Sequence, residues 1–577
     1  MTAHAASLLR TALAIWLLLT APAAWCREAV PVRIIAINDF HGHLEAGDNT
    51  VPVPDPDDPA KTMALRSGGA AYLATRIRQL RAEQPHSIVV SSGDLIGASP
   101  LISGLFLDEP TVEVMNTIGV DLNAVGNHEF DRGTRELLRI VGGGCRTDAV
   151  GESVSCASGS HSYAGARFPF IAVNVHDRDG QALFAPTVVR SFDGVKVGFV
   201  GAVTRNTPGI VQPSGVTGLR FSGEAQSINA AAEQLRRQGV QAIVAVIHEG
   251  GTADGDFNEC DNPRGAIFDI ERQLDPAVDV VLSAHTHHGY RCVMNNRLVI
   301  QGASFGRLVS VVDLMIDRTS GEVMRDQTRA RNVPVPNGLS NQARLQAAYP
   351  ALPPDPEVAA IVEHYRERSA PLASRPIGQL AEAFDRNPTA GGDHALGRLI
   401  ADAQLAATHE QGAVIAFTNP GGIRMDLRPR AGQGTITFGD LYAAQPFGNA
   451  LVTVTLTGAQ LRTLLEQQWS ARNAERPRIL QPSRGFSYTW DPARPAGERV
   501  IAESMRLDGR IITTDGTYRV TVSSFLASGG DGFRVLRDGR DAIGGPLDIE
   551  ALVTYVRRAS AGQPLRPDRA ARIVRRG

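Results

Sequence analysis

The chain has 577 residues, of which 43% are hydrophobic and 20% are charged, and its formal net charge at pH 7 is -2. This composition is typical of a soluble globular protein, and the length calls for two or more domains. The near-neutral charge argues against a nucleic-acid polymer or an anionic membrane surface as the main partner.

Residues 1–26 have the pattern of a secretory signal peptide. Arg10 precedes an apolar run at residues 11–24, and small residues near its end suit cleavage at about residues 23–26. The run is too short for a transmembrane helix, and Trp25 before the first cysteine does not fit a lipid-attachment site. The final residues, RAARIVRRG, lack an apolar tail. We therefore expect a periplasmic or secreted protein without a membrane anchor.

Five apolar runs, each read as a β-strand, end in polar residues that can bind metal ions. The runs are residues 32–39, 87–94, 121–129, 241–249 and 279–287. Because side chains at the carboxyl ends of neighbouring strands converge on one rim of a sheet, we expect these residues to meet there. The candidate ligands are Asp39, His41, Asp94, Asn127, His248, His285 and His287.

This ligand set favours two divalent ions. Cleavage of a phosphate ester needs an activated water and charge screening, and two cations about 3.5–4 Å apart provide both. Carboxylate, amide and imidazole ligands without cysteine suit Mn, Zn, Co, Fe or Mg. Each block alone is typical of a turn or of a surface histidine, so the prediction depends on all five blocks occurring together.

The pattern of strands and helices predicts a layered α/β domain over residues 30–334. Its helices include residues 68–84 and 224–239, and two later runs, 297–303 and 307–317, are read as strands of a second sheet. Proline clusters and one helix indicate a linker at residues 335–375. Residues 376–577, with mixed helices and strands, form a predicted second domain.

The cysteine count is compatible with two disulfides. Loss of Cys26 with the signal segment leaves four cysteines, which allow three pairings. We favour Cys145 with Cys156 and Cys260 with Cys292, because each pair would brace a loop near the predicted metal rim in an oxidising compartment. Free buried thiols are the alternative.

Three glycine-rich segments of the second domain carry candidate binding residues. They are residues 421–424, residues 445–449, and Phe525 followed by residues 529–532. Glycine lets a backbone approach a ligand closely, and an aromatic ring can stack on a flat base. Aromatic packing plugs and simple turns are the alternative interpretation.

The five blocks of the first domain resemble those of the calcineurin-like metallophosphoesterases, and more narrowly of the 5'-nucleotidase family. The resemblance implies a four-layer α/β/β/α sandwich. It also implies that Asp39, His41 and His287 bind one metal and that Asp94 bridges to a second metal held by Asn127, His248 and His285. His128 would face the substrate phosphate, and Asp131 would orient it. The sequence departs from the family pattern at Ala284, where glycine is usual.

The loops of the second domain resemble the same family's C-terminal substrate-binding domain, an α+β unit. The resemblance implies a base sandwiched by Phe447 and Phe525 and contacted by Asn449. It also implies that Asp531 binds ribose and Arg424 binds phosphate.

The departure from the family lies at residues 386–394, before a predicted helix. Family members often carry two further arginines there. In this chain Arg386 falls near the first position and Ala390 at the second. Phosphate contacts would then be fewer, or would come from glycine backbone amides at the helix start or from His394.

Together these features predict an exported, two-metal 5'-nucleotidase acting on nucleoside 5'-monophosphates, with di- and triphosphates as further candidates. The alternatives are a UDP-sugar hydrolase, a 2',3'-cyclic nucleotide phosphodiesterase, or a non-catalytic nucleotide-binding surface protein. The oligomeric state stays open, and a monomer fits the sequence.

Overall fold

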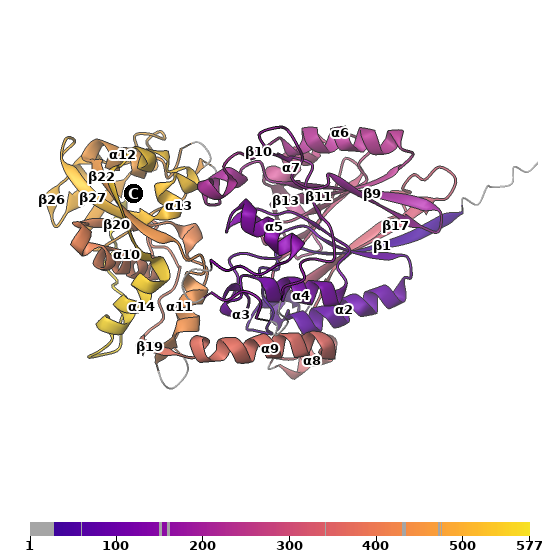
Figure 1. The fold of residues 1–577 in the computed structure, drawn as a ribbon, viewed down its shortest axis with the longest axis horizontal. Helices are drawn as coiled ribbons and strands as arrows, with labels where there is room; N and C mark the ends of the chain where they lie inside the picture. Colours follow the sequence, from indigo (N-terminus) through magenta and orange to yellow (C-terminus); the bar gives the residue numbers. More distant parts are fainter. Residues whose placement is uncertain are drawn as a thin grey trace, which may run out of the picture.

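The computed structural model has two lobes, joined along one side by helix α9 (Pro356–Ala373) (Figure 1). The structure describes residues 28–58, 61–148, 153–157, 162–340, 342–429, 434–470, 473–474 and 476–577. The predicted signal segment at residues 1–26 lies outside them. The first lobe is indigo to pink in Figure 1, and the second is orange to yellow.

The first lobe contains two six-stranded sheets. One has the order β18-β17-β1-β4-β5-β6, in which β1, β4, β5 and β6 run parallel and β17 pairs antiparallel with β1. Its strands are β1 (Ala29–Ile37), β4 (Ser87–Ser91), β5 (Leu122–Ala124), β6 (Phe170–Ile171), β17 (Leu308–Asp317) and β18 (Arg329–Pro334).

The second sheet has the order β15-β16-β14-β11-β9-β8, and its central strands β9, β11, β14 and β16 are parallel. Its strands are β8 (Thr187–Phe192), β9 (Val195–Val203), β11 (Ala242–His248), β14 (Val280–Ser283), β15 (Gly289–Met294) and β16 (Arg297–Gly302). Buried β-branched residues such as Ile34, Val90 and Val244 fill the space between the sheets. Such residues suit strands that are covered on both faces.

Helices cover the two outer faces. The first sheet carries α2 (Ala70–Glu83), α3 (Leu101–Gly104), α4 (Glu109–Ile118) and α5 (Thr134–Gly142), and the second carries α6 (Glu224–Arg237) and α7 (Ala266–Glu271). The predicted four-layer α/β/β/α class is therefore confirmed. One strand assignment is wrong, because residues 307–317 form β17 of the first sheet; its apolar pattern fits an antiparallel partner for β1.

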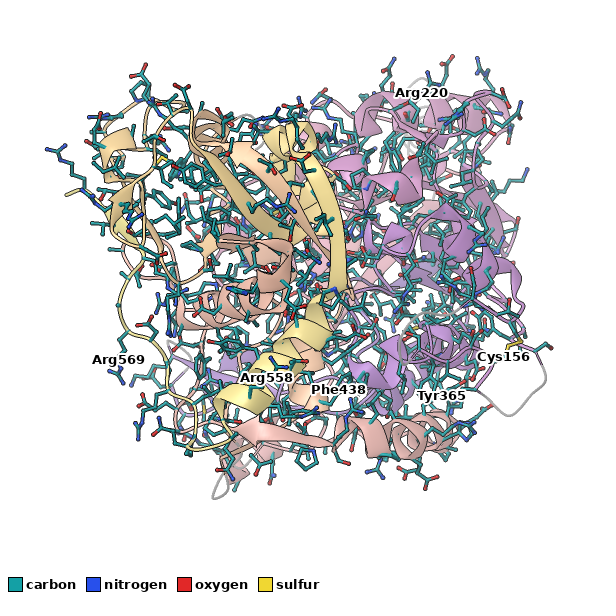
Figure 2. All side chains as sticks on the ribbon, turned by 60° about the vertical axis from the view of Figure 1, so that its left-hand side comes forward. Cys156, Arg220, Tyr365, Phe438, Arg558 and Arg569 are labelled. Atoms are coloured by element: carbon teal, nitrogen blue, oxygen red, sulfur yellow. A yellow bond between two sulfur atoms is a disulfide. The ribbon has the colours of Figure 1, made fainter. Side chains whose placement is uncertain are left out.

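The connection between the lobes is packed rather than free. Residues 343–348 form α8 (Ala343–Ala348), and Asp355 caps α9 by accepting the Val358 N–H at 3.0 Å. Tyr365, labelled in Figure 2, is buried and donates its hydroxyl hydrogen to Glu113 at 2.9 Å. The same core cluster continues into the second lobe through Leu441.

The second lobe is a mixed α+β unit. Its sheets are β23-β20-β27-β22-β28 and β26-β25-β24-β29. The strands are β20 (Ile415–Thr418), β22 (Ala450–Thr457), β23 (Gln481–Pro482), β24 (Phe486–Trp490), β25 (Arg506–Leu507), β26 (Arg510–Ile511), β27 (Thr517–Ser523), β28 (Arg540–Leu547) and β29 (Ile573–Arg575). The helices are α10 (Ala395–Ala407), α11 (Phe438–Ala444), α12 (Gly458–Glu466), α13 (Ser524–Ala527) and α14 (Asp548–Ala559).

Four two-stranded ribbons complete the described strands. They are β2 (Thr50–Pro54) with β3 (Thr62–Arg66), β7 (Val175–His176) with β10 (Arg220–Phe221), β12 (Thr252–Asp254) with β13 (Asp261–Arg264), and β19 (Pro376–Gln379) with β21 (Thr435–Thr437). None of the helices in the described part of the chain combines the length and apolarity needed to cross a membrane.

Both favoured disulfides are present. Cys145 is bonded to Cys156 with a Cα–Cα distance of 5.5 Å, and Cys260 to Cys292 at 5.1 Å. The second bond ties the segment between β12 and β13 to strand β15, which lies next to β16 at the edge of the second sheet. The bond therefore fastens a loop that follows His248.

Candidate metal centre and inter-domain cavity

The first sheet places four candidate ligands at one rim. Asp39 and His41 follow β1, Asp94 follows β4, and Asn127 follows β5. Because β1, β4 and β5 are parallel neighbours, these residues leave the sheet at the same edge. All four side chains are buried, with at most 2% of their surface exposed.

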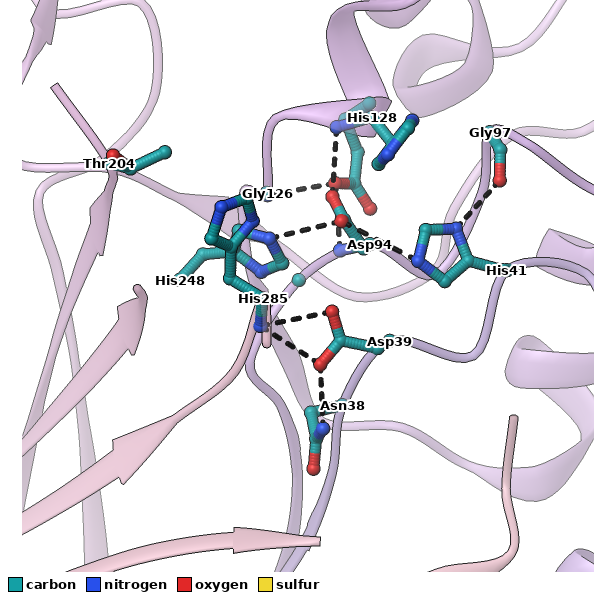
Figure 3. A network of polar contacts seen from close by, with 12 residues as sticks. Asn38, Asp39, His41, Asp94, Gly97, Gly126, His128, Thr204, His248 and His285 are labelled. Atoms are coloured by element: carbon teal, nitrogen blue, oxygen red, sulfur yellow. Dashed lines mark hydrogen bonds and ion pairs between the residues drawn. The ribbon is translucent and has the colours of Figure 1, made fainter. Parts of the chain in front are cut away.

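The second sheet supplies the remaining three ligands. His248 is the last residue of β11, and His285 and His287 follow the parallel strand β14. The expectation of a single sheet rim is therefore wrong: the ligands come from the facing rims of two packed sheets. Figure 3 shows the side chains of both sheets pointing into one space.

The distances bring these side chains within reach of shared ions. Asp94 Oδ2 lies 3.0 Å from His248 Nε2 and 3.6 Å from His41 Nε2. His287 Nε2 lies 3.5 Å from Asp39 Oδ1 and 3.1 Å from His41 Nε2. Three groups among the described residues each have their ligand atoms within 4.8 Å of one another: Asp39 with His41 and His287, Asp94 with His248 and His285, and His41 with Asp94 and His128.

The cluster fits divalent ions. Two imidazole nitrogens bound to one ion at about 2.1 Å lie about 3.0–3.4 Å apart, which matches the His41–His287 pair. Asn127 Oδ1 is buried without a hydrogen-bond partner among the described residues, and His248 Nε2 makes no hydrogen bond despite its short distance to Asp94. Buried polar atoms are normally satisfied, so these atoms indicate a missing ligand partner.

Hydrogen bonds aim the imidazoles at the centre. His41 Nδ1 lies 2.8 Å from the Gly97 carbonyl, and His248 Nδ1 lies 2.8 Å from the Ser92 carbonyl. A carbonyl only accepts, so each Nδ1 carries the proton and each Nε2 presents its lone pair to the cluster. The sequence therefore encodes both the ligands and their orientation.

Burial controls the charge of the cluster. It lowers the pKa of His41 and, together with His248, lowers the pKa of His285 to about 3, so both rings are neutral as metal binding requires. Burial also raises the pKa of Asp39 to about 7, with help from Asp94. Burial opposes protonation of His248, but Asp94 outweighs it and raises the His248 pKa to about 10, so this ring must release its Nε2 proton when it binds a metal.

Five of the seven candidate ligands have a left-handed backbone. Their φ angles are 48° for Asp39, 48° for His41, 52° for Asp94, 73° for His285 and 59° for His287. Residues other than glycine adopt this region at a cost, and such strain clusters at functional sites. The sharp turns redirect the chain immediately after the strands, so the side chains face one another.

Glu129 connects two of the ligand loops. Its carboxylate accepts the N–H groups of Asp94 at 2.9 Å, Leu95 at 2.9 Å and Gly126 at 2.8 Å. These bonds tie the loop after β4 to the loop after β5. The residue belongs to the third block of the sequence, but the pattern did not reveal this positioning role.

His128 and Asp131 form the expected pair beside the cluster. His128 Nδ1 lies 2.7 Å from Asp131 Oδ2, and the backbone N–H of His128 donates to Asp94 Oδ1 at 2.8 Å. Burial lowers the basicity of the His128 ring, but Asp131 and Asp94 raise its pKa overall. The contact with Asp131 thus fixes the proton on Nδ1 and orients the ring so that Nε2 faces the cavity.

A cavity of about 990 Å³ lies between the lobes and opens onto this cluster. It is lined by all six candidate substrate residues of the second lobe: Arg386, Arg424, Phe447, Asn449, Phe525 and Asp531. Phe447 stacks against His128 with ring centroids 5.9 Å apart, and the Arg424 guanidinium lies 5.8 Å from the Phe447 ring centroid. The candidate metal ligands of the first lobe and the candidate substrate residues of the second lobe therefore face one cavity.

Local contacts fix several of these side chains. Asn419 donates to Asp531 at 2.7 Å, and Asn449 donates to the buried Asp548 at 3.3 Å. Phe525 lies on the short helix α13 rather than on a loop. Arg386 donates to Asp426 at 3.0 Å and to the Ile423 carbonyl at 3.3 Å, so part of its guanidinium is already engaged.

The altered segment at residues 386–394 does not replace the expected arginine. His394 caps α10 by accepting the Gly397 N–H at 3.0 Å, and it does not line the cavity. A Cβ at Gly392 would lie 2.9 Å from the Ile479 side chain, so this glycine packs against the loop after α12. The proposed phosphate contacts from His394 or these glycine amides are therefore wrong.

Asn419 and Arg478 are among the cavity residues that the sequence analysis did not find. Asn419 sits two residues before Gly421, and its place beside that motif was an available signal. Arg478 lines the cavity from the loop after α12. Since the chain has only two lysines among its 58 basic residues, an individual arginine carried no signal.

Asp548 gives a prediction about pH. Burial raises its pKa from near 4 to about 7, so the folded state disfavours its charge. The favourable contribution of neutral Asp548 is complete below its unfolded pKa and is lost as pH rises through about 7. Asp548→Asn is therefore expected to raise the melting temperature, relative to the native chain, by more at pH 8 than at pH 5.

Thermal unfolding followed by circular dichroism at constant ionic strength measures this difference. Asp515→Asn, at an exposed turn of the same lobe, is the matched control and is expected to show no such trend. If Asp548→Asn shifted the melting temperature equally at both pH values, the raised pKa of Asp548 would be contradicted.

Comparison with known proteins identifies the class. Residues 32–289 match the family model for calcineurin-like phosphoesterases, and residues 376–538 match that for the 5'-nucleotidase C-terminal domain. Calcineurin-like phosphoesterases are hydrolases that use divalent metals, in agreement with the candidate ligand groups. The chain belongs to the 5'-nucleotidase family, in which these two domains are combined.

Relatives cover most of the chain. It is 33% identical over 560 residues to endonuclease YhcR of Bacillus subtilis, covering 95% of this chain but 41% of that protein. It is 30% identical to cell wall protein Lmo0130 of Listeria monocytogenes, covering 95% of this chain and 70% of that protein. The solved 5'-nucleotidase precursor from Thermus thermophilus is 25% identical with a TM-score of 0.73, covering 95% and 99% of the two chains.

Proposed function

We propose that this chain hydrolyses nucleotides with the help of two divalent ions, acting as a 5'-nucleotidase on nucleoside 5'-monophosphates. The observation that carries the proposal is the single cavity shared by the ligand cluster of the first lobe and by the arginine, phenylalanine and aspartate side chains of the second. A nucleotide needs both surfaces, because its phosphate and its base have different chemistry.

The ligand cluster would hold the ions. Asp39, His41 and His287 form the first set, and Asp94 faces both sets. Asn127, His248 and His285 complete the second set. When bound, the ions polarise phosphoryl oxygens and lower the pKa of coordinated water.

The His128–Asp131 pair would assist departure of the nucleoside. Nδ1 of His128 is held by Asp131, so Nε2 faces the cavity and can carry a proton to the leaving oxygen. The raised pKa of His128 favours the protonated ring that this role requires.

The second lobe would bind the nucleotide. Arg424 suits a phosphate because its planar guanidinium keeps its charge and donates in pairs. Phe447 and Phe525 line the cavity as candidate stacking surfaces, Asn449 offers an amide to the base edge, and Asp531 offers a carboxylate to ribose hydroxyls. A cavity of about 990 Å³ also leaves room for a second phosphoryl group or a sugar.

Comparisons support nucleotides as the substrate class. The chain is 26% identical to the snake venom 5'-nucleotidase of Gloydius brevicauda, covering 94% of this chain and 90% of that protein. It is also 26% identical to an apyrase of Tabanus yao, covering 92% and 91%. We further propose that the protein is exported and acts outside the cytoplasm, as the sequence of residues 1–26 and the two disulfides suggest.

A phosphate-release panel tests the proposal. AMP, UMP, ADP, ATP, UDP-glucose, cyclic nucleotides and p-nitrophenyl phosphate are compared before and after EDTA treatment and after return of Mn, Zn, Co or Mg. We expect AMP and UMP to be hydrolysed, with activity lost in EDTA and restored by metal.

The outcomes separate the alternatives. Preference for UDP-glucose or for 2',3'-cyclic nucleotides would identify the other hydrolases on this scaffold. Tight nucleotide binding without phosphate release from any substrate would favour a binding protein. Activity that survives EDTA would rule out the two-metal assignment.

A further inference from the structure

Arg478 lines the inter-domain cavity and belongs to the described residues 476–480, which follow α12. Its backbone N–H donates to the Gln468 carbonyl at 3.0 Å, and the Leu480 N–H donates to the buried Gln468 side chain at 2.7 Å. Asn473, earlier in the same loop, donates to the carbonyl of Asp531 at 2.9 Å. The loop is thus anchored both to the end of α12 and to the turn that carries Asp531.

The Arg478 guanidinium faces Asp531. Its Nη1 lies 3.5 Å from Asp531 Oδ1, and the Arg478 side chain is 32% exposed while that of Asp531 is 4% exposed. Asn419 takes the other carboxylate oxygen, Oδ2. Among the described residues Asp531 is the one ionic partner of Arg478, so the remaining N–H groups of the guanidinium stay available to a ligand in the cavity.

Arg478 and Arg424 line the same cavity as part of the ligand cluster. The lining includes both arginines together with His285, His287 and Asp531. Arg478 therefore shares this space with candidate metal ligands and with the carboxylate proposed to bind ribose.

The loop of Arg478 also touches the altered segment at residues 386–394. Gly392 packs against Ile479, the residue after Arg478, and the Gln481 side chain donates to the Gly392 carbonyl at 3.2 Å. A larger side chain at Gly392 would collide with this loop. The loop that carries Arg478 is therefore held against Gly392.

We propose that Arg478 is a substrate-binding residue that contacts the nucleotide where the ribose joins the 5'-phosphate. This inference rests on the proposed nucleotidase function. One edge of the guanidinium pairs with Asp531 and fixes that carboxylate toward the ribose hydroxyls. The other edge donates to a phosphate oxygen, which a planar guanidinium does without losing its first partner.

Arg478→Ala tests this contact. Loss of a hydrogen bond to a charged group is expected to raise the KM for AMP about 10- to 100-fold with kcat within about threefold. The inhibition constant of inorganic phosphate is expected to rise in parallel, and that of adenosine to change much less. Arg478→Lys, which keeps the charge, is expected to recover part of the loss.

Arg484→Ala, an exposed arginine of the same lobe outside the cavity lining, is the matched control. Melting temperatures establish that each variant is folded, and Arg478→Gln replaces the alanine variant if that one is unstable. An unchanged KM for AMP would overturn the proposal. An equal loss of adenosine and phosphate affinity would also overturn it, because Arg478 would then act through Asp531 alone.

The outcomes for Arg478 are separable from those for the proposed function. A native protein that hydrolyses no nucleotide would refute the nucleotidase assignment itself. An active native protein with an unaffected Arg478→Ala variant would refute the Arg478 contact alone.

Discussion

Asp94→Asn is expected to lower kcat for AMP by about a thousandfold or more. Asp94 lies 3.0 Å from His248 and 3.6 Å from His41, so its carboxylate faces both halves of the ligand cluster. An asparagine of the same shape removes the negative charge that would offset the two proposed cations. Metal ions contribute several kcal/mol of transition-state charge stabilisation, which corresponds to this loss of rate.

Metal content and steady-state turnover together check this expectation. Mass spectrometry of the purified variant is expected to show less than two ions per chain. Asp193→Asn is a matched control, because Asp193 also has a left-handed backbone, at φ 45°, but lies at an exposed hairpin where it pairs with Arg318. Near-native turnover by Asp94→Asn would remove Asp94 from the proposed centre.

His128→Ala is expected to lower kcat for AMP by about 10²- to 10⁴-fold while KM changes by no more than a few fold. In the proposed function this side chain carries the proton to the leaving oxygen. Asp94 is contacted by the backbone N–H of His128, which the substitution keeps. Metal content is therefore expected to stay native, which distinguishes this variant from Asp94→Asn.

Asp131→Asn is expected to give a smaller fall in kcat, because the neutral amide still holds the ring at Nδ1 but no longer favours its protonated form. His409→Ala, at an exposed position, is the control.

The leaving group gives a further test of His128. The kcat for p-nitrophenyl phosphate, which has a good leaving group, is expected to fall less in His128→Ala than the kcat for AMP. Equal losses on both substrates would contradict the proton-donor role.

The positions of the strands and ligands along the chain were predictable because they depend on neighbouring residues in the sequence. Each candidate ligand directly follows a run of buried residues, and the alternation of strands and helices fixes the layered fold. The assignment of strands to sheets was not local. Residues 307–317 join the first sheet by pairing with β1, more than 270 residues earlier in the chain, and no nearby pattern specifies that partner.

Some site residues of the second lobe could not be predicted from local sequence motifs, because their roles depend on contacts made only in the folded chain. Phe447 and Asp531 were located by their glycine-rich surroundings. Arg478 was missed because its role depends on a neighbouring loop, and the contact of Gly392 with Ile479 exists only in the folded chain. The prediction for His394 was wrong for a related reason. A histidine before a helix can act as a ligand or as a cap, and in the folded chain His394 caps the helix by accepting the Gly397 N–H.

The left-handed backbone lowers the stability of the fold at five residues whose side chains are the candidate metal ligands. These residues are Asp39, His41, Asp94, His285 and His287. Each such residue costs roughly 1–3 kcal/mol, and a whole domain is stable by only about 5–15 kcal/mol. Glycine would relieve this cost at all five positions. A laboratory selection for heat resistance alone would therefore favour glycine at these five positions. The selected chains would be more stable, but they would lack the side chains of the proposed metal centre.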